Sequence, residues 1–140
     1  MYSWRDFEPQ KGQYNFSILK DDYAYLKKYG KEIFKKSQKP VFVTCGERGV
    51  IAFDQNGHYE IQGLQLKNKL DTVGAGDTFY SNLISYFFER KFDGVATRDI
   101  SAMALSSALS YALTAATINV ERVGCNPPSK EEVLARLNHV

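Results

Sequence analysis

Residues 71–77 read Asp-Thr-Val-Gly-Ala-Gly-Asp, between a run that alternates apolar and polar side chains and a run with helical periodicity. Gly74 and Gly76 allow backbone conformations that other residues avoid, and they leave no side chain above the peptide N–H groups. The helix that follows presents the positive end of its dipole to the same place. Because a glycine-rich turn before a helix is a ready anion site, we expect an anion cradle over residues 74–76.

Asp77 stands directly beside this cradle, where a carboxylate repels an anion unless it has a role of its own. One interpretation is an N-cap, in which the carboxylate accepts N–H groups of the first helical turn. The other is a general base that removes the proton of a hydroxyl while the cradle stabilises a phosphoryl group under attack. The two roles are compatible, and the residues alone leave both open.

The elements on either side of the glycine stretch follow from hydrophobic periodicity. Alternation over residues 64–70 predicts a strand that leads into the glycines, and helical spacing predicts a helix over residues 78–89. A run rich in Ala and Ser predicts a second helix over residues 97–119, whose small side chains allow a flat ligand to approach. Ser129 and Glu132 have the spacing of a capping box, which predicts a last short helix.

The upstream part of the chain reads as one helix and three strands. Apolar residues at helical spacing predict an amphipathic surface helix over residues 21–36. The β-branched and aromatic run 41–43 is typical of a strand buried on both faces. Residues 50–54 and 58–62 predict a hairpin, because Asn56-Gly57 supplies the positive φ angles of a tight turn.

Length and composition indicate one compact unit of ordinary charge. The chain has 140 residues, of which 44% are hydrophobic, and a net charge of +2 with acids and bases interleaved. We therefore expect a single domain over residues 1–140 with no nucleic-acid or membrane partner. Residues 1–18 read as an irregular N-terminal segment without the pattern of a secretory signal, so the expected location is cytoplasmic. The apolar run 103–118 is shorter than the roughly 20 residues that a bilayer needs.

Two motifs give the chain a family resemblance. The signature DTVGAGDTF at residues 71–79 resembles the C-terminal motif of ribokinase-like (PfkB) carbohydrate kinases, and TCGERG at residues 44–49 resembles their T-x-G-x-x-G segment. The resemblance extends over most of residues 40–137. It implies an α/β fold, namely the C-terminal part of a Rossmann-type three-layer α/β/α architecture, with the sheet incomplete in this chain.

The resemblance also implies a function and a site. The function would be ATP-dependent phosphoryl transfer to a sugar hydroxyl, with Asp77 as the catalytic base and an anion hole from the backbone of Gly74, Ala75 and Gly76. Residues 113–117 would flank the adenine. The nucleotide would lie along Thr44, Gly46, Gly49, Gly74 and Gly76.

The expected small partners are a sugar, ATP and metal ions. ATP would bring Mg²⁺, yet the family's N-x-x-E motif, associated with the magnesium-bound phosphates, is missing from this sequence. Many family members also hold a monovalent cation such as K⁺, which would place Asp71 and the Val73 carbonyl at that ion, with Gly124 nearby. The sequence therefore leaves open how metal is held.

The family's N-terminal half, which supplies most sugar contacts, has no counterpart here. An incomplete sheet would expose a strand edge, so we expect a longer natural protein or pairing with another chain, a homodimer included. We expect the 140 residues alone to phosphorylate nothing efficiently. An alternative function is a non-catalytic nucleotide-binding module or degenerate kinase relative. A dinucleotide oxidoreductase fits poorly, because no G-x-G-x-x-G opens a βαβ unit.

Overall fold

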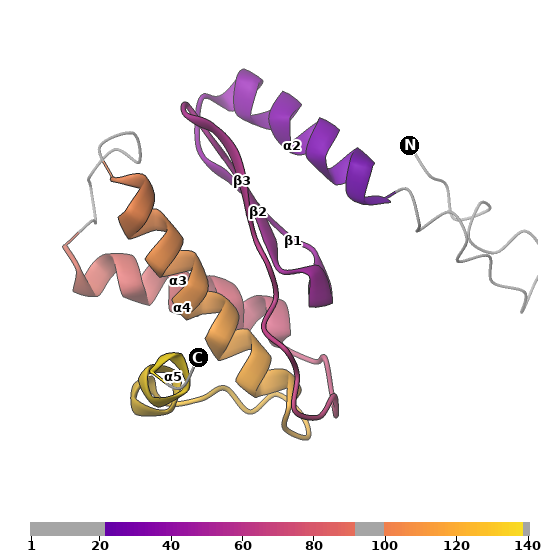
Figure 1. Ribbon diagram of the computed structural model, residues 1–140, viewed down its shortest axis with the longest axis vertical. Coiled ribbons are helices and arrows are strands. Elements are labelled where there is room, and N and C mark those ends of the chain that lie inside the picture. Colours follow the sequence, from indigo (N-terminus) through magenta and orange to yellow (C-terminus); the bar gives the residue numbers. More distant parts are fainter. Residues whose placement is uncertain (1–21, 92–99, 139–140) are drawn as a thin grey trace, which may run out of the picture.

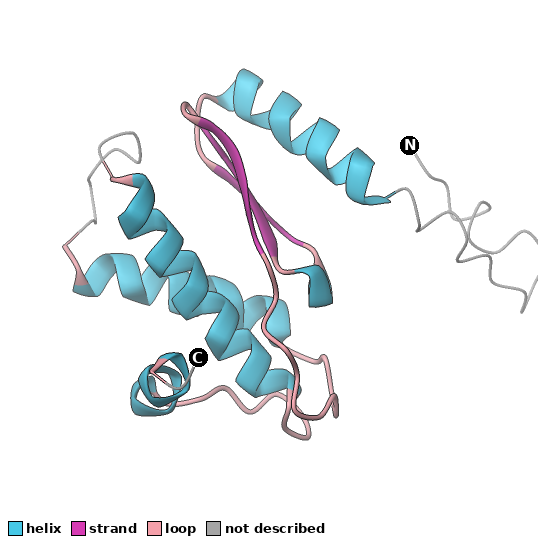
Figure 2. Cartoon of the chain, in the orientation of Figure 1, coloured by secondary structure: helices cyan, strands magenta, loops and turns pink. Residues whose placement is uncertain are grey.

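The computed structural model describes residues 22–91 and 100–138. The irregular segment expected over residues 1–18 lies outside them. In Figure 1 the strands lie between α2 on one side and the pair α3 and α4 on the other, and Figure 2 shows the same layers by element type. The elements are α2 Asp22–Ser37, β1 Val41–Thr44, the 3-10 turn η2 Gly46–Arg48, β2 Val50–Asp54, β3 Gly57–Ile61, α3 Ala75–Glu89, α4 Ala102–Val120 and α5 Lys130–Leu137.

The three strands form an antiparallel sheet in the order β1-β2-β3. β2 is buried along its whole length because it has a strand on each side and helices over both faces. Val50 and Ala52 belong to the main core with residues of α3 and α4. Phe53 turns to the other face, where a Cβ atom added to Gly30 of α2 would lie 2.3 Å from its ring. The alternation of β2 therefore joins both helical layers to one sheet.

The hairpin between β2 and β3 confirms the expected pairing, with a different turn. Asp54 pairs with Gly57, so Gln55 and Asn56 form the turn. Gly57 has a φ of 125°, but Asn56 does not adopt positive φ. Its N–H instead donates to Oδ1 of Asp54 at 2.7 Å. The Asp54 side chain therefore shapes a turn that the sequence analysis assigned to Asn-Gly alone.

β1 is only partly buried, so the expectation of a strand covered on both faces was wrong. Within the described residues, β1 pairs with β2 and has no strand on its other edge. The phenol of Tyr80 donates a hydrogen bond of 3.0 Å to the Phe42 carbonyl. The short apolar run 41–43 indicated a strand correctly, but burial depends on neighbours that lie elsewhere in the chain.

α4 is the central helix of the core. Its Ala, Leu and Thr side chains pack against α3 and the sheet, and Ala108, Leu109 and Ala112 are fully buried. By length and hydropathy α4 could cross a membrane, but 61% of its apolar window is buried inside the protein, as in a core helix. α5 packs against α4 through the buried Val133. Small residues on α4 let both helices approach closely.

Three element boundaries differ from the predictions. Residues 64–70 form no strand, because the N–H groups of Leu70 and Asp71 donate to the Val120 carbonyl at the end of α4 instead of to a sheet. α3 begins at Ala75 and therefore includes part of the glycine stretch. α4 begins at Ala102, where the Ser101 hydroxyl accepts the Ala104 N–H. The predicted start of that helix at residues 97–99 lies outside the described residues.

Candidate functional site

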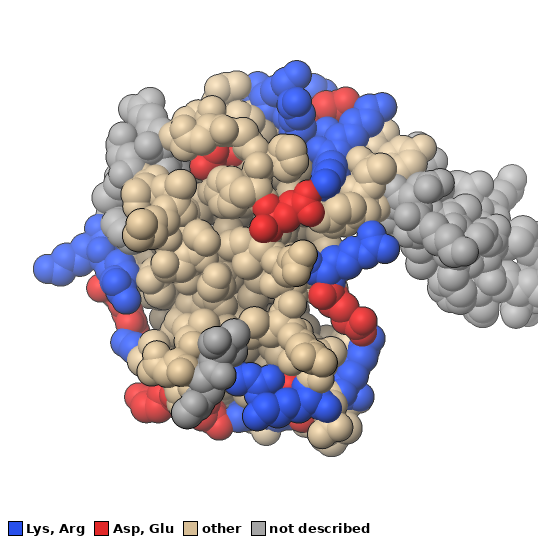
Figure 3. Space-filling model, viewed as in Figure 1, with Lys and Arg blue, Asp and Glu red and all other residues tan. Residues whose placement is uncertain are grey.

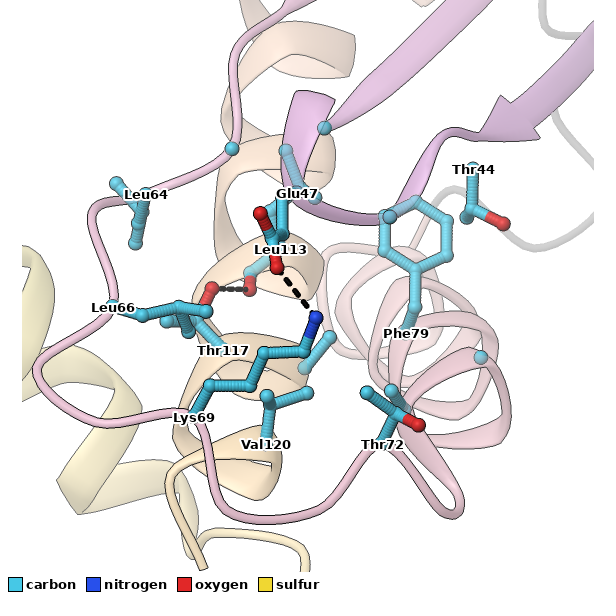
Figure 4. Close-up of a pocket in the computed structure, with 16 residues that line it drawn as sticks. Thr44, Glu47, Leu64, Leu66, Lys69, Thr72, Phe79, Leu113, Thr117 and Val120 are labelled. Atoms are coloured by element: carbon cyan, nitrogen blue, oxygen red, sulfur yellow. Dashed lines mark hydrogen bonds and ion pairs between the residues drawn. The ribbon is translucent and has the colours of Figure 1, made fainter. Parts of the chain in front are cut away.

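A cavity of about 210 Å³ lies where the two glycine segments meet. Thr44 lines it from the end of β1, Gly46 and Gly49 line it from the turn that follows, and Ala75 and Gly76 line it from the start of α3. Figure 4 shows this cavity, with α4 behind it and the segment before α3 along its side. The structure thus brings five of the predicted site residues, from two distant segments, around one space.

The walls of the cavity are mostly apolar. Leu113 and Val120 come from α4, Phe79 from α3, and Leu64 and Leu66 from the extended segment after β3. An apolar cavity with a few polar groups at its edge is the usual form of a site for a small organic ligand. The apolar lining of this cavity suits the ring of a small organic molecule.

The turn over residues 44–49 depends on its glycines. Gly46 and Gly49 have φ angles of 58° and 96°, which side chains rarely adopt. The Cys45 N–H donates to the Gly49 carbonyl at 2.7 Å and closes the turn. A Cβ atom on Gly49 would lie 2.0 Å from the Ile61 carbonyl oxygen. Glycine at this position therefore lets the turn lie directly on the end of β3.

The start of α3 leaves backbone donors free. Gly74 is the N-cap residue, with a φ of 74° and no side-chain cap. The Ala75 N–H donates to the Thr72 carbonyl at 3.2 Å. Within the described part of the chain, the N–H groups of Gly74, Gly76 and Asp77 donate to no protein acceptor. Unpaired donors at the positive end of a helix dipole attract anions.

Asp77 lies in the first turn of α3 and is exposed. Its interpretation as an N-cap was wrong, because the helix begins earlier and Gly74 occupies the cap position. Among the described residues its carboxylate has no hydrogen-bond or ion-pair partner, and Gly76 beside it lines the cavity. The carboxylate is thus unengaged and stands next to the free amides.

The residues expected at a monovalent cation are joined by hydrogen bonds. Oδ1 of Asp71 accepts the Val73 N–H at 2.9 Å, and Oδ2 accepts the Gly124 N–H at 3.1 Å. The Val73 carbonyl accepts Nδ2 of Asn119 at 2.9 Å. Asn119 is fully buried, and its Oδ1 accepts the Asn126 N–H at 2.9 Å. No motif marks Asn119, although a single amide side chain in an apolar helix is a signal in the sequence.

An ion pair that no sequence motif marks also lies at the cavity. Lys69 and Glu47 both line it, and Nζ of Lys69 lies 2.6 Å from Oε1 of Glu47. The hydrogen bond from Lys69 lowers the pKa of the Glu47 carboxyl below its ordinary range. Figure 4 shows the two side chains meeting in front of α4. Their sequence separation hides this contact from local pattern analysis.

Charged side chains form no second candidate site on the face of the molecule that Figure 3 shows. Figure 3 shows acidic and basic side chains interspersed around its edge, with a largely uncharged middle. Among residues 22–91 and 100–138, no three His, Cys, Asp or Glu side chains come together as a metal site. The cavity at the two glycine segments is therefore the candidate site.

Comparisons with known proteins agree on one family. The profile described as pfkB family carbohydrate kinase matches residues 12–132. Among similar solved structures, a ribokinase from Thermotoga maritima has a TM-score of 0.64 and 25% identity, over 88% of this chain and 39% of its own. The chain thus spans about two fifths of that protein.

Two further structures show the same likeness. A ribokinase from Arabidopsis thaliana, complexed with ribose and ATP, has a TM-score of 0.58 and 26% identity, over 71% of this chain and 29% of its own. Phosphofructokinase-2 from Escherichia coli, in complex with potassium, has a TM-score of 0.63 and 20% identity, over 85% and 34%. Each of the three structures matches 71% or more of this chain.

Proposed function

The chain belongs to the pfkB family of carbohydrate kinases, and we propose that it forms the nucleotide-binding part of an enzyme that transfers the γ-phosphoryl group of ATP to a sugar hydroxyl. The observation that carries this proposal is the cavity at the meeting point of the two glycine segments. It combines apolar walls with the start of α3, where the N–H of the lining residue Gly76 is unpaired and the unpaired N–H groups of Gly74 and Asp77 lie on either side in sequence. The ATP and ribose named for the Arabidopsis ribokinase support this choice of ligands.

The lining of the cavity suggests how ATP would lie. The adenine would occupy the apolar part between Leu113, Val120 and Leu64, where a flat ring removes the most apolar surface from water. The turn at Gly46 and Gly49 would run along the nucleotide. The phosphates would then extend toward the start of α3, where the dipole and the free amides oppose their charge.

Asp77 would act as the general base. Its unengaged carboxylate would take the proton of the sugar hydroxyl as that oxygen attacks the γ-phosphorus and the bond to ADP breaks. The N–H groups of Gly74 and Gly76 would stabilise the charge on the phosphoryl oxygens, together with the N–H of Asp77. The Ala75 N–H, assigned to the anion hole by resemblance, would first have to leave the Thr72 carbonyl.

Mg²⁺ would neutralise phosphate charge when bound with ATP. Among the described residues no three His, Cys, Asp or Glu side chains come together, so Mg²⁺ would be held mainly by the phosphates of ATP and by water. We therefore assign no step of the reaction to a metal held by this part of the chain. Sugar contacts would come from elsewhere, since the chain spans 39% of the Thermotoga maritima ribokinase.

The test is Asp77→Asn in the complete reading frame that encodes this chain, assayed for ADP formation with a panel of sugars. We expect kcat to fall by about 10²- to 10⁴-fold, because the variant cannot accept the proton. Nucleotide affinity by calorimetry should not fall and should rise by up to about threefold, because the amides remain and the carboxylate that repels phosphate is gone. Glu89→Gln, at the far end of the same helix, is the matched control and should keep full turnover.

Two outcomes would contradict the proposal. Unchanged turnover in Asp77→Asn would remove the base assignment. Nucleotide binding without ADP formation for any sugar would favour the alternative, a non-catalytic nucleotide-binding module. The absence of an acidic cluster among the described residues is the observation that keeps this alternative in the test.

A further inference from the structure

Asn119 is the centre of a hydrogen-bond network beside the signature segment at residues 71–76. Its side chain is fully buried in α4, and it donates to the Val73 carbonyl and accepts from the Asn126 N–H, both at 2.9 Å. It therefore joins the residue before Gly74 to the loop that follows α4. A buried amide with both ends paired fixes its partners firmly, because breaking either bond leaves a polar group without water.

Asp71 completes the same network from the other side. Its carboxylate accepts the N–H groups of Val73 and Gly124, at 2.9 and 3.1 Å. The loop that holds Gly124 is thus attached to the signature segment twice, once through Asp71 and once through Asn119. Both attachments lie within a few residues of the amides that we assign to phosphate binding.

These oxygens are the ones that a monovalent cation would use, and hydrogen bonds within this chain already engage them. The donor hydrogens of Val73, Gly124 and Asn119 already point at the Asp71 carboxylate and the Val73 carbonyl. Each oxygen keeps a further lone pair, but a cation on the Val73 carbonyl would lie close to the positive end of the buried Asn119 amide, which opposes it. The potassium named for Escherichia coli phosphofructokinase-2 belongs to that protein, which is 20% identical to this chain.

We propose that Asn119 is a positioning residue that takes the place of a monovalent cation in this protein. Its amide fastens the Val73 carbonyl and the loop after α4, so that the free amides of the α3 start are held in place without K⁺. The proposal rests on the proposed function for the role of those amides. It predicts that nucleotide binding and thermal stability do not depend on the identity of the monovalent cation.

The first experiment uses the unmodified full chain. Its melting temperature and its affinity for ATP are measured in KCl, NaCl and tetramethylammonium chloride at equal ionic strength. A cation that binds only the folded protein raises the melting temperature with its concentration. We expect no such rise specific to K⁺, and ATP affinities that agree within about twofold across the three salts. A rise specific to K⁺ would overturn the proposal.

The second experiment changes the donor while keeping its shape. Asn119→Asp still accepts the Asn126 N–H but cannot donate to Val73, and its oxygens now face the carbonyl. We expect ATP affinity to fall by about tenfold in tetramethylammonium and to recover to within about threefold in KCl, because a cation can bridge the oxygens. A merely structural role for Asn119 would lower the melting temperature equally in every salt.

Two further variants keep the test decisive. Asn119→Ala removes the amide without adding charge, so any gain of potassium dependence would still appear if Asn119→Asp folds poorly. Asn82→Asp is the matched control: Asn82 also donates its amide to a backbone carbonyl, that of Thr78 at 2.9 Å, but lies outside the network. It should gain no potassium dependence, and a gain there would contradict the assignment to Asn119.

The melting temperature separates this inference from the proposed function. If the protein binds no nucleotide but its stability is insensitive to potassium in the unmodified form and sensitive in Asn119→Asp, the proposed function fails and the inference stands. If it binds ATP and K⁺ stabilises the unmodified protein, the inference fails and the proposed function stands.

Discussion

The ammonium group of Lys69 lies 2.6 Å from a carboxylate oxygen of Glu47, across the cavity that we assign to ATP. Glu47 belongs to the turn after β1, and Lys69 lies two residues before the signature that opens α3. Both side chains are more than half exposed, so the pair adds little to folding stability. Its consequence is for binding, because a phosphate group competes with the Glu47 carboxylate for the same ammonium group.

Glu47→Gln and Lys69→Gln should therefore change ATP affinity in opposite directions. Glu47→Gln frees the ammonium group, so we expect tighter binding, by about threefold, whereas Lys69→Gln should weaken it by about tenfold. Calorimetry at low and moderate salt is the measurement, and the difference should shrink as salt screens the charges. Lys67→Gln, a neighbouring lysine outside the cavity lining, controls for net charge. Equal affinities in all the variants would show that Lys69 does not meet the nucleotide.

Gly74 has no room for a side chain. A Cβ atom there would lie 2.3 Å from Sγ of Cys125, and the residue has a φ of 74°. Gly74→Ala should therefore cost the clash in addition to the roughly 1–2 kcal/mol of a left-handed non-glycine residue. Chemical denaturation gives the free energy of unfolding that checks this.

The control for Gly74 is another glycine of the same backbone class. Gly124 has a φ of 69°, but a Cβ atom there would meet nothing within 4 Å, so Gly124→Ala should cost only the backbone strain. Adding Cys125→Ala to Gly74→Ala should recover part of the loss, because the sulfur is the atom in the way. A double-mutant cycle without any coupling energy would contradict the clash.

Local patterns predicted most elements because the cues are local. The amphipathic periodicity of α2, the capping box of α5 and the strands of the hairpin each depend on residues a few positions apart. Residues 64–70 show the limit of this reasoning. Their alternation indicated a strand, yet the N–H groups that end the segment donate to Val120, about 50 residues away.

In the candidate site, too, local motifs were predictable and contacts between distant residues were not. The two glycine segments were assigned to a nucleotide by family resemblance, and their meeting around one cavity appears only in the fold. Asn119 and Lys69 carry no motif, since their partners Val73 and Glu47 lie 46 and 22 residues away in sequence. Such side chains are selected by tertiary contacts, so a single sequence cannot rank them above other buried amides or exposed lysines.

The capping box of α5 makes a prediction about pH. The Ser129 hydroxyl accepts the Glu132 N–H at 3.3 Å, and Oε2 of Glu132 accepts the Ser129 N–H at 2.7 Å. That backbone hydrogen bond, and then the ion pair with Arg122, hold the pKa of Glu132 below its ordinary value of 4.5. A lowered pKa in the folded protein means stability that is fully present above pH 4.5 and lost as pH falls through the folded value.

Glu132→Gln should therefore flatten the acid side of the stability profile, whereas Ser129→Ala should lower the whole profile. The glutamine keeps one acceptor but does not titrate, so its melting temperature should fall less than that of the unmodified protein below pH 4.5. Ser129→Ala removes the cap at every pH, at a cost of about 0.5–2 kcal/mol, and leaves the titrating carboxylate in place. Melting temperatures from pH 3 to 7, roughly the range over which carboxylates titrate, measure both effects. Parallel profiles for Glu132→Gln and the unmodified protein would show that this carboxylate contributes nothing to the acid-side loss, since removing its titration would then leave the slope unchanged.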